Sequence, residues 1–226
     1  RNSWLGQENW SHKAHFGMDH FGNEKNQLSL YGFASAFSNE QEGRIEISGS
    51  EGDSTPSVYS MIKDDTDRNR SAYGSFYYRH LFRPRTELIL ESSYYLLRAY
   101  SGTDLTDPGR EVRVSNRAEP GRDEVQVRAH FSSGINDRIS VETGLEQQFN
   151  LMRDALFTSF SYGERVSAGY LQGTFKGDRF TAITGLRAEY NRVRYSDVLD
   201  QRRFFLLPQF DLKYTFNQKN NLRISY

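Results

Sequence analysis

Cysteine is absent from the sequence, and several other features are missing with it. Without thiols the chain forms neither disulfides nor thiolate metal sites. The 29 basic residues are balanced by 29 acidic residues, so the chain lacks the basic excess that is typical of nucleic-acid-binding proteins. No apolar run approaches the roughly 20 residues of a membrane helix, and Phe204–Pro208 is among the longest. These absences argue against nucleic-acid binding and exclude a helical membrane protein.

What is present is a polar chain rich in aromatic residues. Hydrophobic residues make up 36% of the sequence and aromatic residues 14%, and the mean hydropathy is −0.76. Phe and Tyr favour β-strands. Within Phe180–Asn191, Leu186 and its alternate neighbours carry no charge, whereas Arg187 and Glu189 occupy the positions between them. Strict alternation predicts a strand whose two faces meet unlike environments.

Short turn segments rich in Gly, Asn, Asp and Pro divide the chain into predicted hairpins. These hairpins join His12–Phe21 to Gln27–Phe37, Ser71–Phe82 to Thr86–Tyr100, Glu124–Ser132 to Ile139–Phe149, Val166–Phe175 to Phe180–Arg192, and Phe204–Phe216 to Leu222–Tyr226. Longer polar segments connect the hairpins and are predicted to be loops. They cover Ser38–Arg70, Ser101–Asp123, Asn150–Arg165 and Val193–Arg203. The third of these holds the sole candidate helical segment, at 155–160.

Tight turns that alternate with long loops are typical of a transmembrane barrel. At the usual rise and tilt, Phe180 and Tyr190 lie about 25 Å apart along the barrel axis, which matches an apolar band between two aromatic girdles. We therefore predict an all-β fold, an antiparallel up-and-down transmembrane β-barrel of about ten strands. Short turns lie at one end and long loops at the other. Charged faces line a wet lumen, and a soluble secreted β-sandwich or barrel that acts as a binding module is the alternative.

The pattern is weaker in two predicted strands. Gln27–Phe37 and Thr86–Tyr100 carry apolar residues on both faces, and in the second strand Glu91 is the main mark of the polar side. A piece cut from a larger barrel also exposes two strand edges, which lipid does not tolerate. The chain begins at Arg1 and shows no signal peptide. We expect residues 1–226 to form a single barrel domain that is part of a larger barrel or closes as a smaller one.

The sequence shows no motif of an enzyme. It contains no Gly-x-Ser-x-Gly elbow, phosphate loop or dinucleotide fingerprint. His12 and His15 are three residues apart, so on a strand they point to opposite faces and do not share a metal ion. Asp64–Arg70 begins like a calcium loop, but Arg70 and Phe76 replace the required Gly and Glu. We expect no catalytic residue, cofactor or metal, and a solvated loop at Asp64–Arg70.

Charged residues that recur on one face of a predicted strand are also explained without an active site. Glu142 with Glu146, and Arg187 with Glu189, would lie on one face of their strands. Paired carboxylates occur in glycosidases, yet a polar barrel lining predicts the same pattern. His130 is predicted to face the lumen as well. The basic aromatic cluster within 192–205 is predicted to be a charged collar at the membrane surface, with contact to lipopolysaccharide phosphates or another anion as the alternative.

Three segments resemble a known family. "FGMDHFGNEKNQLSLYGFASAFSN" (Phe16–Asn39), "ITGLRAEYNRVRY" (Ile183–Tyr195) and "FFLLPQFDLKYTFNQKNNLRISY" (Phe204–Tyr226) are similar to the outer-membrane β-barrel domain of Bacteroidetes TonB-dependent receptor-like proteins, and they occur in family order. The resemblance implies a barrel of about 22 strands around a plug. It also implies uptake of bulky nutrients across a Gram-negative outer membrane, driven by TonB.

The resemblance sets the remaining expectations. The plug is expected to lie outside this chain, and so are the regions that contact the TonB complex. Expected partners are outer-membrane lipid, lipopolysaccharide and an unspecified nutrient, without nucleic acid, and the nutrient-binding residues are unknown. A passive or structural outer-membrane barrel is the alternative within the same fold. A plug domain upstream in the full-length protein distinguishes a receptor from a passive barrel.

Overall fold

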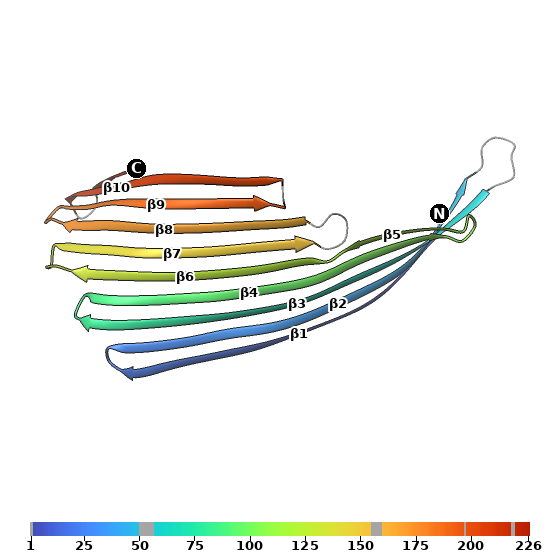
Figure 1. Cartoon of the computed structure of the whole chain (residues 1–226), viewed down its shortest axis with the longest axis horizontal. Coiled ribbons are helices and arrows are strands. Elements are labelled where there is room, and N and C mark those ends of the chain that lie inside the picture. Colours follow the sequence, from blue (N-terminus) through green and yellow to red (C-terminus); the bar gives the residue numbers. More distant parts are fainter. Residues whose placement is uncertain (1, 50–56, 155–159, 197, 218–219) are drawn as a thin grey trace.

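The computed structural model describes residues 2–49, 57–154, 160–196, 198–217 and 220–226 (Figure 1). The chain forms an 11-stranded antiparallel sheet in which neighbours in space are neighbours in sequence, in the order β1-β2-β3-β4-β6-β7-β8-β9-β10-β11. The short strand β5 pairs with β4 beside this path. This is the predicted all-β, up-and-down topology. Among the described residues, no helix has the length and apolar character needed to cross a membrane.

Most strands are long for a β-protein, as expected of strands that span a bilayer and continue beyond it. The strands are β1 (Asn2–Asn23), β2 (Asn26–Gly49), β3 (Ser57–Arg83), β4 (Thr86–Asp107), β5 (Val112–Ala118), β6 (Pro120–Gly134), β7 (Ile139–Asp154), β8 (Phe160–Lys176), β9 (Phe180–Tyr195), β10 (Leu199–Asn217) and β11 (Asn220–Ser225).

The strands of all the predicted hairpins are paired as expected, and the turns among the described residues gather at one end of the sheet (Figure 1, left). Asn136 shows how such a turn is held, because its side-chain oxygen accepts hydrogen bonds from the backbone amides of Arg138 and Ile139. Arg85 follows Pro84 and has a positive φ of 65°. Gly, Asn, Asp and Pro therefore mark these turns, as the sequence indicated.

The prediction of long loops at the opposite end was wrong in part. Strands β2 and β3 continue through most of Ser38–Arg70, and Val193–Arg203 forms the ends of β9 and β10 around a short turn. The segment Ser101–Asp123 holds β5, which brings the strand count to 11 instead of about ten. The polar residues that indicated loops are paired across strands: Arg68 with Glu40 at 2.8 Å, and Thr103 with Asp65 at 2.7 Å.

Two smaller expectations concern the same segments. Asp64–Arg70 lies within β3 and is not a loop. The candidate helical segment falls on residues 155–159, which lie outside the described residues, and Phe160 begins β8.

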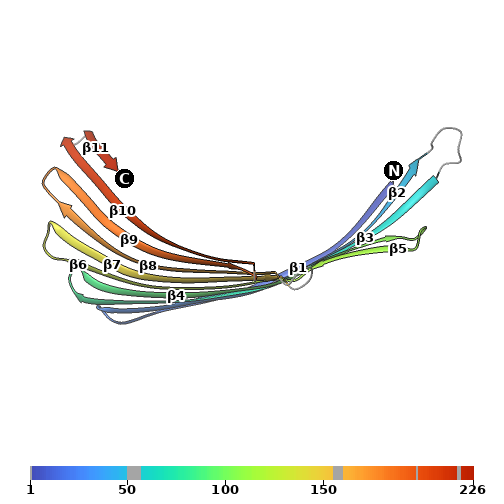
Figure 2. The ribbon, with the colours of Figure 1, turned by 45° about the horizontal axis from the view of Figure 1, so that its top comes forward.

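The sheet is a single curved layer (Figure 2). Ala168 is the only hydrophobic residue among the described ones that is buried, at 7% exposure, and β1 and β11 remain unpaired edges of the sheet. A β-sandwich would bury a core between two layers. The described residues have no such core, so the sandwich alternative is wrong. The apolar side chains must be covered by something outside this chain.

Candidate functional site: the two faces of the barrel wall

Strand register assigns every described residue of the wall to one of two faces, because partners in a ladder point to the same side. Leu186 pairs with Leu171 on one side and Pro208 on the other. The same row continues through Thr143 and Phe131 to Leu88. Leu186 is 50% exposed and Leu171 is 58% exposed. We call the side that carries this row the apolar face.

The apolar face has no charged side chain over a long part of each strand from β3 to β10, apart from β5. On β9 this band runs from Phe180 to Tyr190, which corresponds to about 25 Å along the axis of a tilted strand. Beyond the band each strand presents its first charged residue, and together these form a charged collar: Arg70, Arg98, Asp123, Arg153, Arg165, Arg192 and Arg202. A charge-free band below a charged collar is the pattern of a wall in contact with lipid.

The opposite side, the polar face, holds an ionic cluster centred on Glu146 of β7. Its carboxylate accepts hydrogen bonds from Arg187 at 3.1 Å, Arg128 at 3.3 Å and Gln126 at 3.0 Å. Arg187 also donates to Glu189 at 3.1 Å. The Glu146 side chain is 17% exposed, so the cluster is held tightly against the sheet. Charges at this depth are compatible with a wet lumen and incompatible with lipid.

A small residue makes this cluster possible. Arg187 lies on β9 and Glu146 lies on β7, so their ion pair crosses over β8. Ala168 of β8 is the partner of both Glu146 and Glu189 in the two ladders, and it is buried beneath the ion pairs. A longer side chain at this position would block the approach of the guanidinium group.

A second polar-face contact depends on a glycine. Tyr170 of β8 lies across Gly144 of β7, stacks on the ring of His130 at 6.2 Å between centroids and hydrogen-bonds to its Nδ1. A Cβ on Gly144 would lie 2.5 Å from the Tyr170 ring. His130 therefore belongs to the polar face, as the sequence indicated.

This arrangement predicts the effect of adding one methyl group. Gly144→Ala in the full-length protein should force Tyr170 away from His130 and lower the free energy of unfolding by about 1–2 kcal/mol. Gly173→Ala, on the adjacent strand, is the control, because no atom lies within 4 Å of its Cβ position. Urea unfolding in lipid vesicles measures both variants, and equal losses in the two would contradict the role of Gly144.

The structure separates the other residues that the sequence singled out. His12 and His15 belong to opposite faces of β1, and His15 contacts the hydroxyl of Tyr31 at 3.0 Å. Glu142 and Glu146 share the polar face as expected, but only Glu146 takes part in the ionic cluster. Among the described residues, no group of three His, Asp or Glu side chains is arranged to hold a metal ion.

The basic cluster near residues 192–205 is held together by Asp200. This carboxylate pairs with Arg192 at 2.6 Å, Arg202 at 3.4 Å and Arg194 at 3.8 Å. The hydrogen bond from Arg192 lowers the pKa of Asp200 far below its usual value. A depressed carboxyl pKa contributes stability at neutral pH that disappears only in strong acid. The charged collar therefore exists here as predicted, but Arg192, Arg194 and Arg202 are already paired with Asp200.

Lipid-facing and lumen-facing sides on one meandering sheet define the wall of an outer-membrane β-barrel. The chain belongs to the outer membrane protein beta-barrel family, whose model matches residues 91–226. It is located in the outer membrane. No curated protein matches the chain in sequence.

Solved structures share this fold. The ferric-catecholate import receptor Fiu from E. coli K12 superposes with a TM-score of 0.55 at 9% identity, over 99% of this chain and 53% of the receptor. The FrpB iron transporter from Neisseria meningitidis superposes with a TM-score of 0.53 at 12% identity, over 95% of this chain and 43% of the transporter. The alcaligin receptor FauA from Bordetella pertussis superposes with a TM-score of 0.50 at 14% identity, over 96% of this chain and 40% of the receptor. Such low identities show the fold alone, and the chain spans about half the length of these receptors or less.

Proposed function

We propose that this chain is the barrel portion of a TonB-dependent receptor that takes up a bulky nutrient through the outer membrane. The observation that carries the proposal is the superposition of nearly the whole chain on about half or less of an import receptor, an iron transporter and an outer-membrane receptor. The three segments that resemble Bacteroidetes receptor-like barrels support it independently.

The two open edges support the same proposal. Strands β1 and β11 have one unpaired side each, and an unpaired edge is not tolerated in lipid. Additional strands of a longer chain satisfy both edges and widen the barrel. A lumen of the resulting size is wide enough for bulky solutes, and a plug is needed to close it against leakage.

The polar face suits such a plug. The Glu146 cluster lies at the depth of the charge-free band, and its groups are held in fixed positions by mutual ion pairs. A folded plug is best held by an ordered array of donors and acceptors, since ordering loose side chains would cost entropy. We propose that transport is energised by the TonB complex through regions outside this chain, with the nutrient class open, and that the protein catalyses no reaction.

Ion conductance distinguishes the energised receptor from a passive barrel. The full-length protein should show almost no conductance in planar bilayers and should bind the periplasmic domain of TonB. A steady open-channel conductance with no TonB binding would establish the passive barrel instead. Deletion of any plug segment from the full-length protein is the positive control, because it should open the channel.

A further inference from the structure

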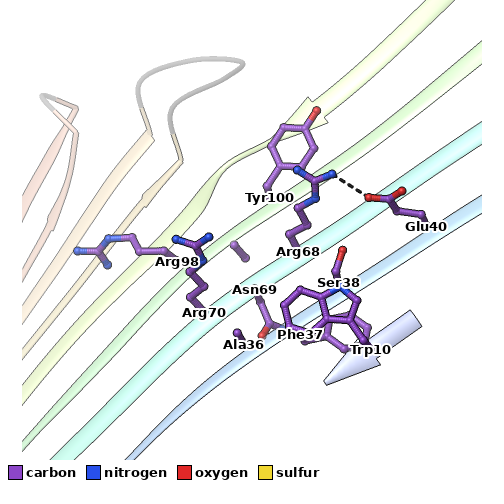
Figure 3. Close-up of a pocket in the computed structure, with 11 residues that line it drawn as sticks. Trp10, Ala36, Phe37, Ser38, Glu40, Arg68, Asn69, Arg70, Arg98 and Tyr100 are labelled. Atoms are coloured by element: carbon purple, nitrogen blue, oxygen red, sulfur yellow. Dashed lines mark hydrogen bonds and ion pairs between the residues drawn. The ribbon is translucent and has the colours of Figure 1, made fainter. Parts of the chain in front are cut away.

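Two arginines of the charged collar lie directly opposite each other on the apolar face. Arg70 of β3 pairs in register with Arg98 of β4, and Arg68 lies on the same face of β3 beyond Arg70 (Figure 3). Side chains at such positions lie about 5 Å apart at Cβ, and like charges placed there repel each other. An anion bound between them would remove this repulsion.

The arginines differ in their protein partners. Arg98 donates two hydrogen bonds to Asp123 at 2.8 and 3.0 Å, and Arg68 donates to Glu40 at 2.8 Å. Arg70 has no ion pair within the part of the chain that the structure describes. This contrasts with the collar near Asp200, where three arginines share one carboxylate. Of the three arginines gathered here, Arg70 is therefore the one whose guanidinium group is left for an external anion.

The arginines border a hollow of about 470 Å³. Trp10 and Tyr100 lie on its walls with Arg68, Arg70 and Arg98 (Figure 3). Trp and Tyr favour the boundary between lipid tails and headgroups, and arginine there binds phosphate through paired N–H groups. The hollow therefore combines the side chains that recognise a phosphate at a membrane surface.

A second hollow of about 660 Å³ continues from the first toward the charge-free band, and the two share Ala36, Arg70 and Arg98. Its walls on the apolar face are mostly small or aliphatic side chains: Ala14, Ala34, Ala36, Ala72 and Leu96. The arginines thus lie at the upper end of a shallow apolar groove. An occupant with a phosphate and an acyl chain fits both hollows at once.

We propose that this surface binds the phosphorylated, acylated lipid of the outer leaflet, the lipid A part of lipopolysaccharide. Arg70 and Arg98 bind its phosphate, Arg68 and Trp10 flank the headgroup, and an acyl chain lies along the alanine groove. A soluble anionic nutrient is the wrong occupant, because the hollow opens on the lipid side of the wall and not on the lumen. The proposal requires only an outer-membrane barrel and does not depend on transport.

Binding of lipid A to the full-length protein in phosphatidylcholine nanodiscs tests the proposal. Arg70→Gln should weaken the apparent affinity about tenfold, the loss of one charge-assisted contact to phosphate. Arg194→Gln is the matched control and should change it less than twofold. Ala36→Phe should also weaken binding by filling the groove without altering charge.

Two probes separate the sources of the anion. Dephosphorylated lipid A should bind to the wild type at least as weakly as lipid A binds to Arg70→Gln, because it loses the contacts to both Arg70 and Arg98, and inorganic phosphate alone should not compete at equal concentration. Equal loss in Arg70→Gln and Arg194→Gln would overturn the site in favour of unspecific charge attraction. Binding of free phosphate without lipid would overturn the lipid assignment. Gel mobility of unboiled samples verifies that each variant is folded.

Discussion

Replacing Leu186 with arginine is expected to prevent the barrel from assembling stably. Leu186 lies on the apolar face near the middle of the charge-free band of β9, and its side chain is 50% exposed. An arginine at mid-membrane costs about 2–4 kcal/mol, which is a large share of the stability of a typical domain. Leu186→Arg should therefore lower the folded fraction in lipid vesicles sharply, measured by the mobility of unboiled samples on gels.

The matched control places the same substitution on the opposite face of the same strand. Ile183 lies three residues earlier, on the polar face, so Ile183→Arg places the same charge in the lumen. We expect Ile183→Arg to fold with a loss below about 1 kcal/mol. If both variants fold equally well, or both fail, the assignment of the two faces is wrong.

Reversing the charge of Glu146 is expected to have the second-largest effect. Glu146→Lys would place a cation against Arg128 and Arg187, the two guanidinium groups that now bind the carboxylate. Breaking a partly buried ionic cluster and adding repulsion should lower the free energy of unfolding by about 3 kcal/mol. Urea unfolding in vesicles measures the loss.

A second variant and a double variant make this test specific. Glu142→Lys is the control, because Glu142 has only a weak hydrogen bond from Gln172 at 3.5 Å and no ion pair in the described ranges. Combining Glu146→Lys with Arg128→Glu should recover part of the loss, since Arg128 pairs with no other carboxylate among the described residues and the opposite charges face each other again. Absence of any recovery would show that Glu146 acts through shape and not through its ion pairs.

The positions of the hairpins were predictable from the sequence because their signals are local. Turn residues such as Asn136 and the alternation along Phe180–Tyr190 each depend on a few neighbouring residues. The assignment of His130 and Arg187 to the polar face followed from the same period of two. The strand Gln27–Phe37 was ambiguous because both of its faces carry apolar residues, and its register with β1 and β3 decides which residues belong to which face.

Contacts between distant strands were not predictable in this way. Arg187 reaches Glu146 over Ala168, and the sequence separation of 41 residues leaves no local signal. The polar segments around Arg68 and Thr103 looked like loops because their strands are stabilised by cross-strand ion pairs and hydrogen bonds, not by apolar alternation. The Arg70–Arg98 pair likewise appears only once β3 and β4 are aligned.

The absence of cysteine allows a direct test of the central claim, that alternate residues of one strand meet lipid and water. Single cysteines placed in turn at residues 183–190 of the full-length protein, with any cysteine outside this chain replaced, accept a spin label in lipid vesicles. Labels at even positions, Leu186 among them, should collide with dissolved oxygen in the bilayer, and labels at odd positions with a water-soluble nickel complex. Accessibility that alternates with a period of two confirms the account, and uniform accessibility to the nickel complex along the strand contradicts it.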